Sequence, residues 1–170
     1  MKKLRLLAVF VLFGFQLAAQ TLTSSNLPLI IINTNGQTIV DDPKITADMG
    51  IVSNGVGIRN NITDPYNQYN GKIGIEIRGQ SSQMFPMKSY GIELRDNAGN
   101  SQDKSLFGLP KESDWVLYAP YTDKTLMRNF LAYTMSREMG HWSANCQFVE
   151  VVVDGDYKGI YVFMEKIKRG

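Results

Sequence analysis

Hydrophobic and polar positions alternate with a period of two along residues 71–95, and this pattern predicts two β-strands joined by a polar turn. In the first strand, Ile73, Ile75 and Ile77 alternate with polar residues or glycine, as expected when one face is buried. In the second strand, Lys88 falls on the apolar face. Burying an ammonium group is unfavourable unless it meets an anion or reaches the edge of the sheet. The pattern therefore makes Lys88 a candidate for contact with an anion.

The turn between these strands begins with Arg78-Gly79-Gln80-Ser81-Ser82 and is rich in hydrogen-bond donors. Backbone N–H groups and hydroxyls beside a glycine can hold a phosphate group. The alternative interpretation is an ordinary connection between two sheet strands. The spacing of the residues leaves both interpretations open.

The last third of the chain predicts a β-hairpin. Strand-like runs cover residues 147–153 and 157–166, and Asp154-Gly155 between them is a dipeptide typical of tight hairpin turns. Both faces of the hairpin are largely apolar, so we expect both to be covered. Another continuous apolar run predicts a strand over residues 27–33.

One helix is predicted over residues 123–139, with Asp123 among its candidate capping residues and Gly140 as its stop. An apolar stripe, expected to face the core, comprises Met127, Phe130, Leu131 and Met135. Glu138 returns close to this stripe near the helix C-terminus, which favours either a cationic partner or a solvated position at the margin. Together the elements predict an α+β fold, mainly antiparallel β-sheet with one principal α-helix.

Composition and charge narrow the class of protein. The 170 residues, 44% hydrophobic and 20% charged, are typical of a globular domain. Residues 1–19 have the basic, apolar and small-residue regions of a signal peptide, followed by a polar linker over 20–26 and no later segment suited to spanning a membrane. The three basic residues of this leader account for the net charge of +2, which becomes −1 without them. This balance gives no electrostatic case for binding nucleic acid. The single cysteine, Cys146, is expected to be a buried structural thiol.

Three blocks of sequence carry a resemblance to a known family. Residues 75–94, 106–129 and 148–169 resemble, in this order, the CotH kinase family of spore-coat-protein-H-like atypical protein kinases. The resemblance implies that residues 27–170 form the N-terminal part of a kinase domain with a kinase-like N-lobe fold. It further implies ATP and a divalent cation, Mg or Mn, and transfer of the γ-phosphate to Ser or Thr of secreted or surface proteins. The protein would then be secreted or associated with the cell envelope.

The same resemblance assigns site residues. Lys88 takes the role of the phosphate-contacting lysine, and Glu138 is its possible partner. The nucleotide-binding set consists of Arg78, Gly79, Gln80, Ser81, Ser82 and Lys88, with Met164, Glu165 and Lys166 bordering the adenine. The family's catalytic and metal-binding aspartates belong to a C-terminal lobe, so we expect them beyond Gly170, with no metal site in this chain.

An alternative from another functional class stays open. The chain could be a non-catalytic, secreted β-rich module that binds surface glycans or protein partners. Trp115, Tyr118 and Tyr121 would supply an aromatic platform for such binding. They could equally belong to the core and its rim.

Overall fold

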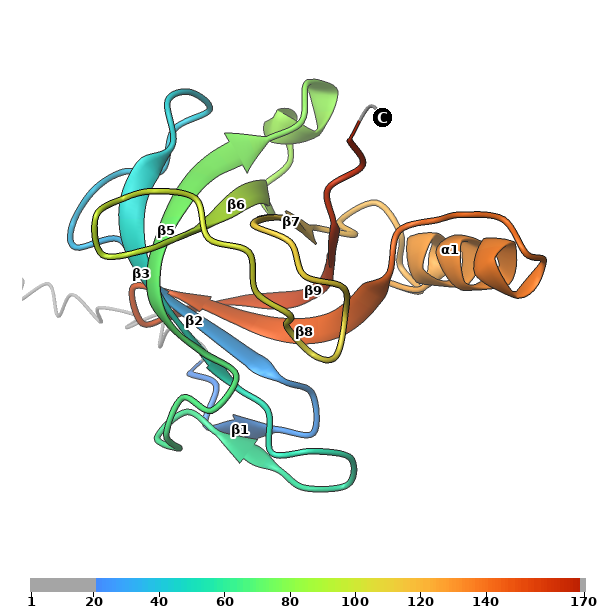
Figure 1. Cartoon of the computed structure of the whole chain (residues 1–170), viewed down its shortest axis with the longest axis horizontal. Coiled ribbons are helices and arrows are strands. Elements are labelled where there is room, and N and C mark those ends of the chain that lie inside the picture. Colours follow the sequence, from blue (N-terminus) through green and yellow to red (C-terminus); the bar gives the residue numbers. More distant parts are fainter. Residues whose placement is uncertain (1–20, 169–170) are drawn as a thin grey trace, which may run out of the picture.

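The structure is a computed structural model that describes residues 21–168, so the predicted signal peptide lies outside the described residues. β-Strands are the main regular structure of the described chain, with one α-helix beside them (Figure 1). The strands are β1 (Ser24–Ser25), β2 (Leu29–Asn33), β3 (Ile45–Val52), β4 (Asn60–Asn61), β5 (Tyr69–Arg78), β6 (Ser89–Arg95), β7 (Asp114–Tyr118), β8 (Cys146–Val153) and β9 (Asp156–Glu165). The helices are the 3-10 helix η1 (Ser81–Met84) and α1 (Arg128–Glu138).

Seven of the strands form a closed barrel in the order β2-β3-β5-β6-β7-β9-β8. All neighbours in the barrel are antiparallel except β2 and β8, which run parallel and close it. The pairing of Leu29–Ile32 with Glu150–Val153 joins parts of the chain that are far apart in sequence. The short strands β1 and β4 form a separate ribbon.

The prediction of a kinase-like α+β N-lobe is therefore wrong. Among residues 21–168, strands outweigh helix, the main sheet closes into a barrel, and the one α-helix is short and has no buried residue. The physical reason is the parallel pairing of β2 with β8, which removes the open edges that an N-lobe sheet would keep. Local alternation predicted the strands but carries no information on which distant strands pair.

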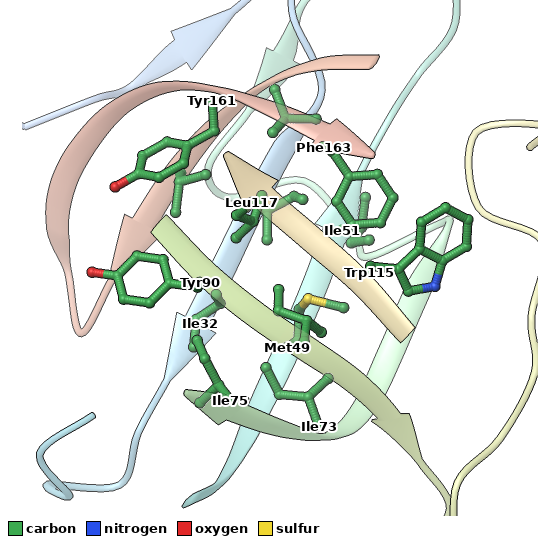
Figure 2. Close-up of a cluster of buried hydrophobic side chains, with 14 of the residues drawn as sticks. Ile32, Met49, Ile51, Ile73, Ile75, Tyr90, Trp115, Leu117, Tyr161 and Phe163 are labelled. Carbon is green, nitrogen blue, oxygen red and sulfur yellow. The ribbon is translucent and has the colours of Figure 1, made fainter. Parts of the chain in front are cut away.

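The barrel interior is filled by the inward faces of the strands, as Figure 2 shows. Ile73 and Ile75 on β5, and Tyr90, Ile92 and Leu94 on β6, are all buried there, which confirms the predicted alternation. Aromatic rings also pack in the core as stacked pairs: Trp115 with Phe163 at 4.7 Å between ring centroids, and Tyr90 with Tyr161 at 6.2 Å.

The β8–β9 hairpin is confirmed, with Asp154 and Gly155 both at positive φ in its turn. Its inner face belongs to the barrel core. On its outer face, Cys146, Val162 and Met164 pack into a second apolar cluster with side chains of α1. Both faces are thus covered, as the pattern predicted. Burial raises the pKa of the Cys146 thiol, in keeping with a structural rather than nucleophilic cysteine.

The helix is shorter than predicted and begins at Arg128 rather than Asp123. Leu126, at φ 60, interrupts the helical backbone. Asp123 still stabilises the helix start, because its carboxylate accepts hydrogen bonds from the backbone N–H groups of Thr125 (3.0 Å) and Arg128 (2.8 Å). Of the predicted core stripe, only Phe130 packs on the barrel, where it stacks on Phe148 at 4.5 Å.

Among residues 21–168, no helix has the length and apolar character needed to cross a membrane.

Candidate functional site

A cavity of about 220 Å³ opens where the β5–η1 connection, the outer faces of β6, β7 and β9, and the start of α1 meet. We call it the loop–helix cavity. Its lining residues are Arg78, Gly79, Ser82, Ser89, Val116, Tyr118, Asn129, Tyr133, Met164, Glu165 and Ile167. Small-molecule sites usually measure about 300–1,000 Å³, so the described residues enclose room for part of a nucleotide rather than all of it.

The loop side of the cavity is shaped by a backbone that requires glycine. Gly79 has φ 105, and a β-carbon there would collide with the hydroxyl of Ser82. The loop is held in place by Gln83, whose Nε2 donates to the carbonyl oxygen of Gly79 (2.5 Å) and to Asp41 Oδ1 (2.8 Å). Arg78 at the end of β5 is exposed at the cavity and brings a guanidinium group suited to phosphate or carboxylate.

The opposite wall of the cavity carries a buried acid. Glu165, the last residue of β9, accepts hydrogen bonds on Oε2 from the backbone N–H (2.7 Å) and the side-chain Nδ2 (3.1 Å) of Asn145. These bonds fix the carboxylate and the end of β9. Met164 adds an apolar surface beside it. The cavity therefore has a cationic loop on one side and a fixed carboxylate with apolar neighbours on the other.

Sequence reasoning missed the contribution of the helix start. Asn129 and Tyr133 on α1 line the cavity together with Ser89, the first residue of β6. The Ser89 hydroxyl accepts a hydrogen bond from the backbone N–H of Ala119 (3.0 Å), which ties β6 to the segment after β7. Two features of the sequence could have indicated this contribution. Asn129 is the last residue of the second family block, and Ser89 lies on the other face of its strand from the inward-facing Tyr90.

Tyr118 supplies a phenol at the same cavity. Burial raises its pKa, with smaller contributions from nearby Asp123 and Tyr133. The hydroxyl thus stays protonated at neutral pH and remains a hydrogen-bond donor.

Lys88 lies elsewhere. Its ammonium donates a hydrogen bond to the carbonyl oxygen of Gln83 (2.5 Å). It lines a second cavity, at the end of the barrel, which we call the barrel-end cavity. This cavity has a volume of about 470 Å³ and is lined by Pro86, Met87, Lys88, Tyr90, Tyr121, Tyr157, Lys158 and Tyr161. The structure does not bring Lys88 into the cavity that holds Arg78, Gly79 and Ser82.

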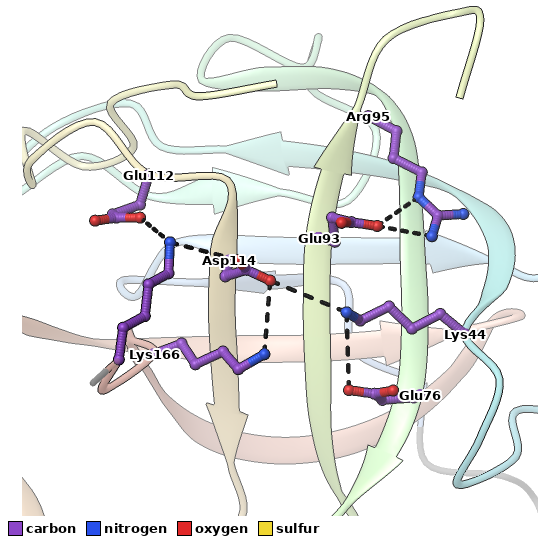
Figure 3. A network of polar contacts seen from close by, with 8 residues as sticks. Lys44, Glu76, Glu93, Arg95, Glu112, Asp114 and Lys166 are labelled. Atoms are coloured by element: carbon purple, nitrogen blue, oxygen red, sulfur yellow. Dashed lines mark hydrogen bonds and ion pairs between the residues drawn. The ribbon is translucent and has the colours of Figure 1, made fainter. Parts of the chain in front are cut away.

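Lys166, the third residue of the predicted adenine-bordering segment, points into an ionic network on the outer barrel face (Figure 3). Lys166 and Lys44 both approach Oδ1 of Asp114, at 3.7 and 4.0 Å. Lys44 also lies 3.9 Å from Glu76 Oε1. The network ties β5 and β7 to the segment after β9. Its surface position makes each pair a weak contributor to stability.

The remaining predicted residues lie outside both cavities. Glu138 is exposed in the last turn of α1 and is not paired with Lys88 among the described residues. Gln80 and Ser81 are exposed at the start of η1, and neither lines the loop–helix cavity.

The three residues of the predicted aromatic platform do not form one surface. Trp115 is fully buried against Phe163, so it cannot contact a ligand. Tyr118 lines the loop–helix cavity, whereas Tyr121 stacks on Phe85 at 5.2 Å and lines the barrel-end cavity. Of the two alternatives, Trp115 thus belongs to the core, because it faces the barrel interior.

The described residues do not fit a complete metal site. Across residues 21–168, no group of three or more His, Cys, Asp or Glu side chains is arranged to hold a metal ion. The loop–helix cavity contributes a single carboxylate, Glu165, with one oxygen already bonded to Asn145. We therefore assign no metal-dependent step to this part of the protein.

Comparison with known proteins relates the chain to one family and to a spore-coat protein. A family model described as "CotH kinase protein" matches residues 75–170. "Inner spore coat protein H" of Bacillus subtilis (strain 168) is 32% identical over 101 residues, which is 59% of this chain and 25% of that protein. The chain therefore spans about a quarter of the length of this curated relative. The matched region runs from β5 onward and includes every residue of the loop–helix cavity.

Proposed function

The chain belongs to the CotH kinase protein family, as its three sequence blocks predicted, and on that premise we propose that it holds the nucleotide of an ATP-dependent phosphotransferase. In this reaction the bond from the γ-phosphorus to the bridging oxygen of ADP breaks and a bond to a Ser or Thr hydroxyl oxygen forms. The hydroxyl proton is released. The acceptors are secreted or surface proteins, and the protein works in the cell envelope or outside the cell. The name of the spore-coat relative and the leader-like residues 1–19 support this location.

The observation that carries the proposal is the composition of the loop–helix cavity. It is lined by the glycine loop, which the family resemblance assigned as the nucleotide-facing loop, and by Met164 and Glu165, which it assigned to the border of the adenine. The two segments are more than eighty residues apart in sequence and meet only through the barrel. A cavity with a guanidinium group on one side and an apolar, hydrogen-bonding wall on the other suits a phosphate-bearing ring compound.

Each wall has a distinct part in binding. Arg78 offers paired N–H donors to phosphate oxygens, and the backbone at Gly79 permits close approach. Ser82 and Asn129 add neutral donors, which fix orientation without adding charge. Phosphoryl transfer depends on positioning and on stabilisation of charge at the phosphate oxygens. We propose that the divalent cation meets ligands outside residues 21–168, because these residues supply one carboxylate at the cavity.

The test is titration of ¹⁵N-labelled chain with ATP, with and without MgCl₂, followed by NMR. We expect shifts concentrated at Gly79, Ser82 and Glu165. Arg78→Gln should weaken ATP binding about tenfold or more, since losing one charge-assisted contact of about 1.4 kcal/mol gives a factor of ten. Lys111→Gln, a change of the same charge at an exposed loop position, is the matched control and should alter binding less than about twofold.

The same titration decides the role of Lys88. If Lys88→Met abolishes ATP binding while Arg78→Gln leaves it intact, the nucleotide site is the barrel-end cavity and the proposed site is wrong. If ATP shifts no resonance of the loop–helix cavity at millimolar concentration, nucleotide binding by this region is wrong as well.

A second candidate function, a binding module for surface glycans, is favoured by the barrel-end cavity. Four tyrosines line it, and aromatic faces beside polar groups are typical of small-molecule sites. Lys88 and Lys158 would add a preference for acidic sugars. Titration with a galacturonic acid oligomer tests this function independently of ATP, and a neutral galactose oligomer serves as the control. Binding that is lost in Tyr121→Ala would support it, and the absence of shifts around the cavity would exclude it.

A further inference from the structure

Gln83 in η1 is hydrogen-bonded to three separate segments of the chain. Its side-chain Nε2 donates to the carbonyl oxygen of Gly79 (2.5 Å) and to Oδ1 of Asp41 (2.8 Å). Its backbone carbonyl oxygen accepts a hydrogen bond from Nζ of Lys88 (2.5 Å). Asp41 belongs to the connection between β2 and β3, Gly79 follows β5, and Lys88 precedes β6. We call Asp41, Gly79, Gln83 and Lys88 the Gln83 cluster.

The β2–β3 connection is itself fixed beside the loop. The backbone N–H of Ile77, near the end of β5, donates a hydrogen bond to the carbonyl oxygen of Val40 (2.7 Å). Asp41 is the next residue, so its carboxylate is held where Gln83 can reach it. The connection therefore supports the loop after β5 from outside, at a position that precedes the family match over residues 75–170.

Gly79 needs such outside support. Glycine has no preferred backbone region of its own, so the direction of its carbonyl group is set by the contacts that it makes. Gly79 adopts φ 105, and its carbonyl oxygen is bonded to Gln83. Arg78 and Ser82, on either side of this bond along the chain, both line the loop–helix cavity. The placement of these two side chains thus depends on how Gly79 is held.

Lys88 acts on the same loop from the other side. It lines the barrel-end cavity and not the loop–helix cavity. Its ammonium is bonded to a carbonyl oxygen of the short helix η1, and a cation at the last carbonyls of a helix is favourable. The bond fixes the backbone at Gln83, whose side chain in turn fixes Gly79.

We propose that Asp41, Gln83 and Lys88 are positioning residues of the loop–helix cavity, which hold Gly79 so that Arg78 and Ser82 face the ligand. None of the three touches the ligand. The inference rests on the proposed nucleotide site. It gives Lys88 an indirect role in place of the phosphate contact that the family resemblance implies, and it adds Asp41, which the family match does not include.

The charge of Asp41 allows a test in which two explanations predict opposite signs. An acid near a phosphate site repels the phosphate, so by charge alone its removal strengthens ATP binding. A positioning role predicts the reverse for Asp41→Ala, because the acceptor for Gln83 is lost. We expect Asp41→Ala to weaken ATP binding about threefold or more, as for the loss of one hydrogen bond. Asp41→Asn is the matched control, since it removes the charge and keeps an acceptor oxygen, and it should not weaken binding.

A second pair of variants tests Lys88. Lys88→Met removes the donor to Gln83 and should weaken ATP binding about threefold or more. Lys88→Arg keeps a cationic donor of similar reach and should retain binding to within about twofold. Thermal unfolding of the four variants should stay within about 2 °C of the original chain, because each change removes at most one hydrogen bond at the surface or its margin.

The Gly79 amide of the free protein gives a measurement that needs no nucleotide. In ¹⁵N NMR spectra without ATP, Asp41→Ala and Lys88→Met should each shift the Gly79 resonance, although neither residue is bonded to Gly79. The Gly155 resonance, in the β8–β9 turn, is the control and should not move. ATP titrations of the same samples then give the affinities.

Three results would overturn the proposal. Tighter ATP binding by Asp41→Ala would mean that Asp41 acts through its charge. An unmoved Gly79 resonance in both variants of the free protein, with ATP binding lost in Lys88→Met, would mean that Lys88 contacts the nucleotide directly. If Gly79 moves as expected in the free variants but ATP shifts no resonance of the cavity in the original chain, the nucleotide site itself is wrong and the positioning role is rejected with it.

Discussion

The barrel interior and the outer side of α1 are built from the same kinds of side chain and end in opposite environments. Met49 in the barrel is 1% exposed, whereas Met135 on α1 is 61% exposed. The interior is enclosed because each strand has two neighbours, and the closure leaves no apolar face uncovered. Among residues 21–168, α1 packs through Phe130 and Tyr133 on the apolar cluster at the outer faces of β7, β8 and β9, which covers one of its sides. The hydrophobicity of a side chain therefore does not by itself determine whether it is buried. Burial also depends on how many elements surround its position.

The largest expected difference between the two regions concerns Trp115. Trp115→Ala removes a fully buried ring that stacks on Phe163 and donates a hydrogen bond to the carbonyl oxygen of Glu112 (3.1 Å). We expect a loss of about 3–5 kcal/mol in the free energy of unfolding. Urea denaturation followed by circular dichroism measures it. A loss below about 1 kcal/mol would mean that the barrel interior is not tightly packed around this ring.

A matched pair of methionines gives the most direct comparison. Met49→Ala should lower the free energy of unfolding by about 2–5 kcal/mol, because it leaves a cavity in the barrel. Met135→Ala should change it by less than about 0.5 kcal/mol, since it removes exposed atoms from a surface helix. Both variants are measured at the same low protein concentration. Equal losses for the two would contradict the difference in burial on which the comparison rests.

The turn of the β8–β9 hairpin tests whether a substitution at an exposed position can lower the stability of the fold. Gly155 has φ 80, and an added β-carbon would meet nothing within 4 Å. Gly155→Ala should therefore destabilise the fold by about 1–2 kcal/mol through backbone strain alone. The measurement is the shift in the thermal unfolding midpoint. Gly57, in a loop outside the barrel, also has φ 80, and Gly57→Asn serves as a milder comparison. An unchanged midpoint for Gly155→Ala would show that the turn relaxes.

The smallest expected effect is a pH dependence confined to the helix. The pKa of Asp123 is lowered in the folded protein, chiefly by the hydrogen bond from Thr125 and also by the N–H of Arg128. Its stabilising contribution is therefore complete above the unfolded pKa of about 3.9 and is lost as the pH falls through the lower folded value. Hydrogen exchange should show α1 amides losing protection below about pH 4 before the barrel amides do.

Asp123→Asn keeps hydrogen-bonding capacity without the titration. In this variant the protection of α1 should no longer depend on pH in the acid range. If α1 in Asp123→Asn lost protection with the same pH dependence as the original chain, another group would be responsible for the acid sensitivity of the helix.

The sequence by itself determined the local structure and the family. Alternation along β5 and β6 identified the inward residues correctly, and Asp154-Gly155 identified the hairpin turn, because side-chain direction and turn conformation depend on neighbouring residues. The three sequence blocks identified the family because each block is long. Arg78, Gly79, Ser82, Met164 and Glu165, which the family resemblance assigned to a nucleotide site, line one cavity, and their role in binding stays a prediction.

Only the tertiary structure decided the rest. Closure of the barrel rests on the pairing of β2 with β8, and pairing between distant strands leaves no trace in a local pattern. The same closure turned Trp115 inward and placed Lys88 at the barrel end, away from Arg78. The predicted core-facing stripe of the helix was wrong, because Phe130 packs on the barrel whereas Met127, Leu131 and Met135 are exposed. The anchoring of α1 through Phe130 and Arg137 set which side faces the barrel. A periodic pattern specifies which side chains share a face, whereas the surrounding elements determine whether that face is covered.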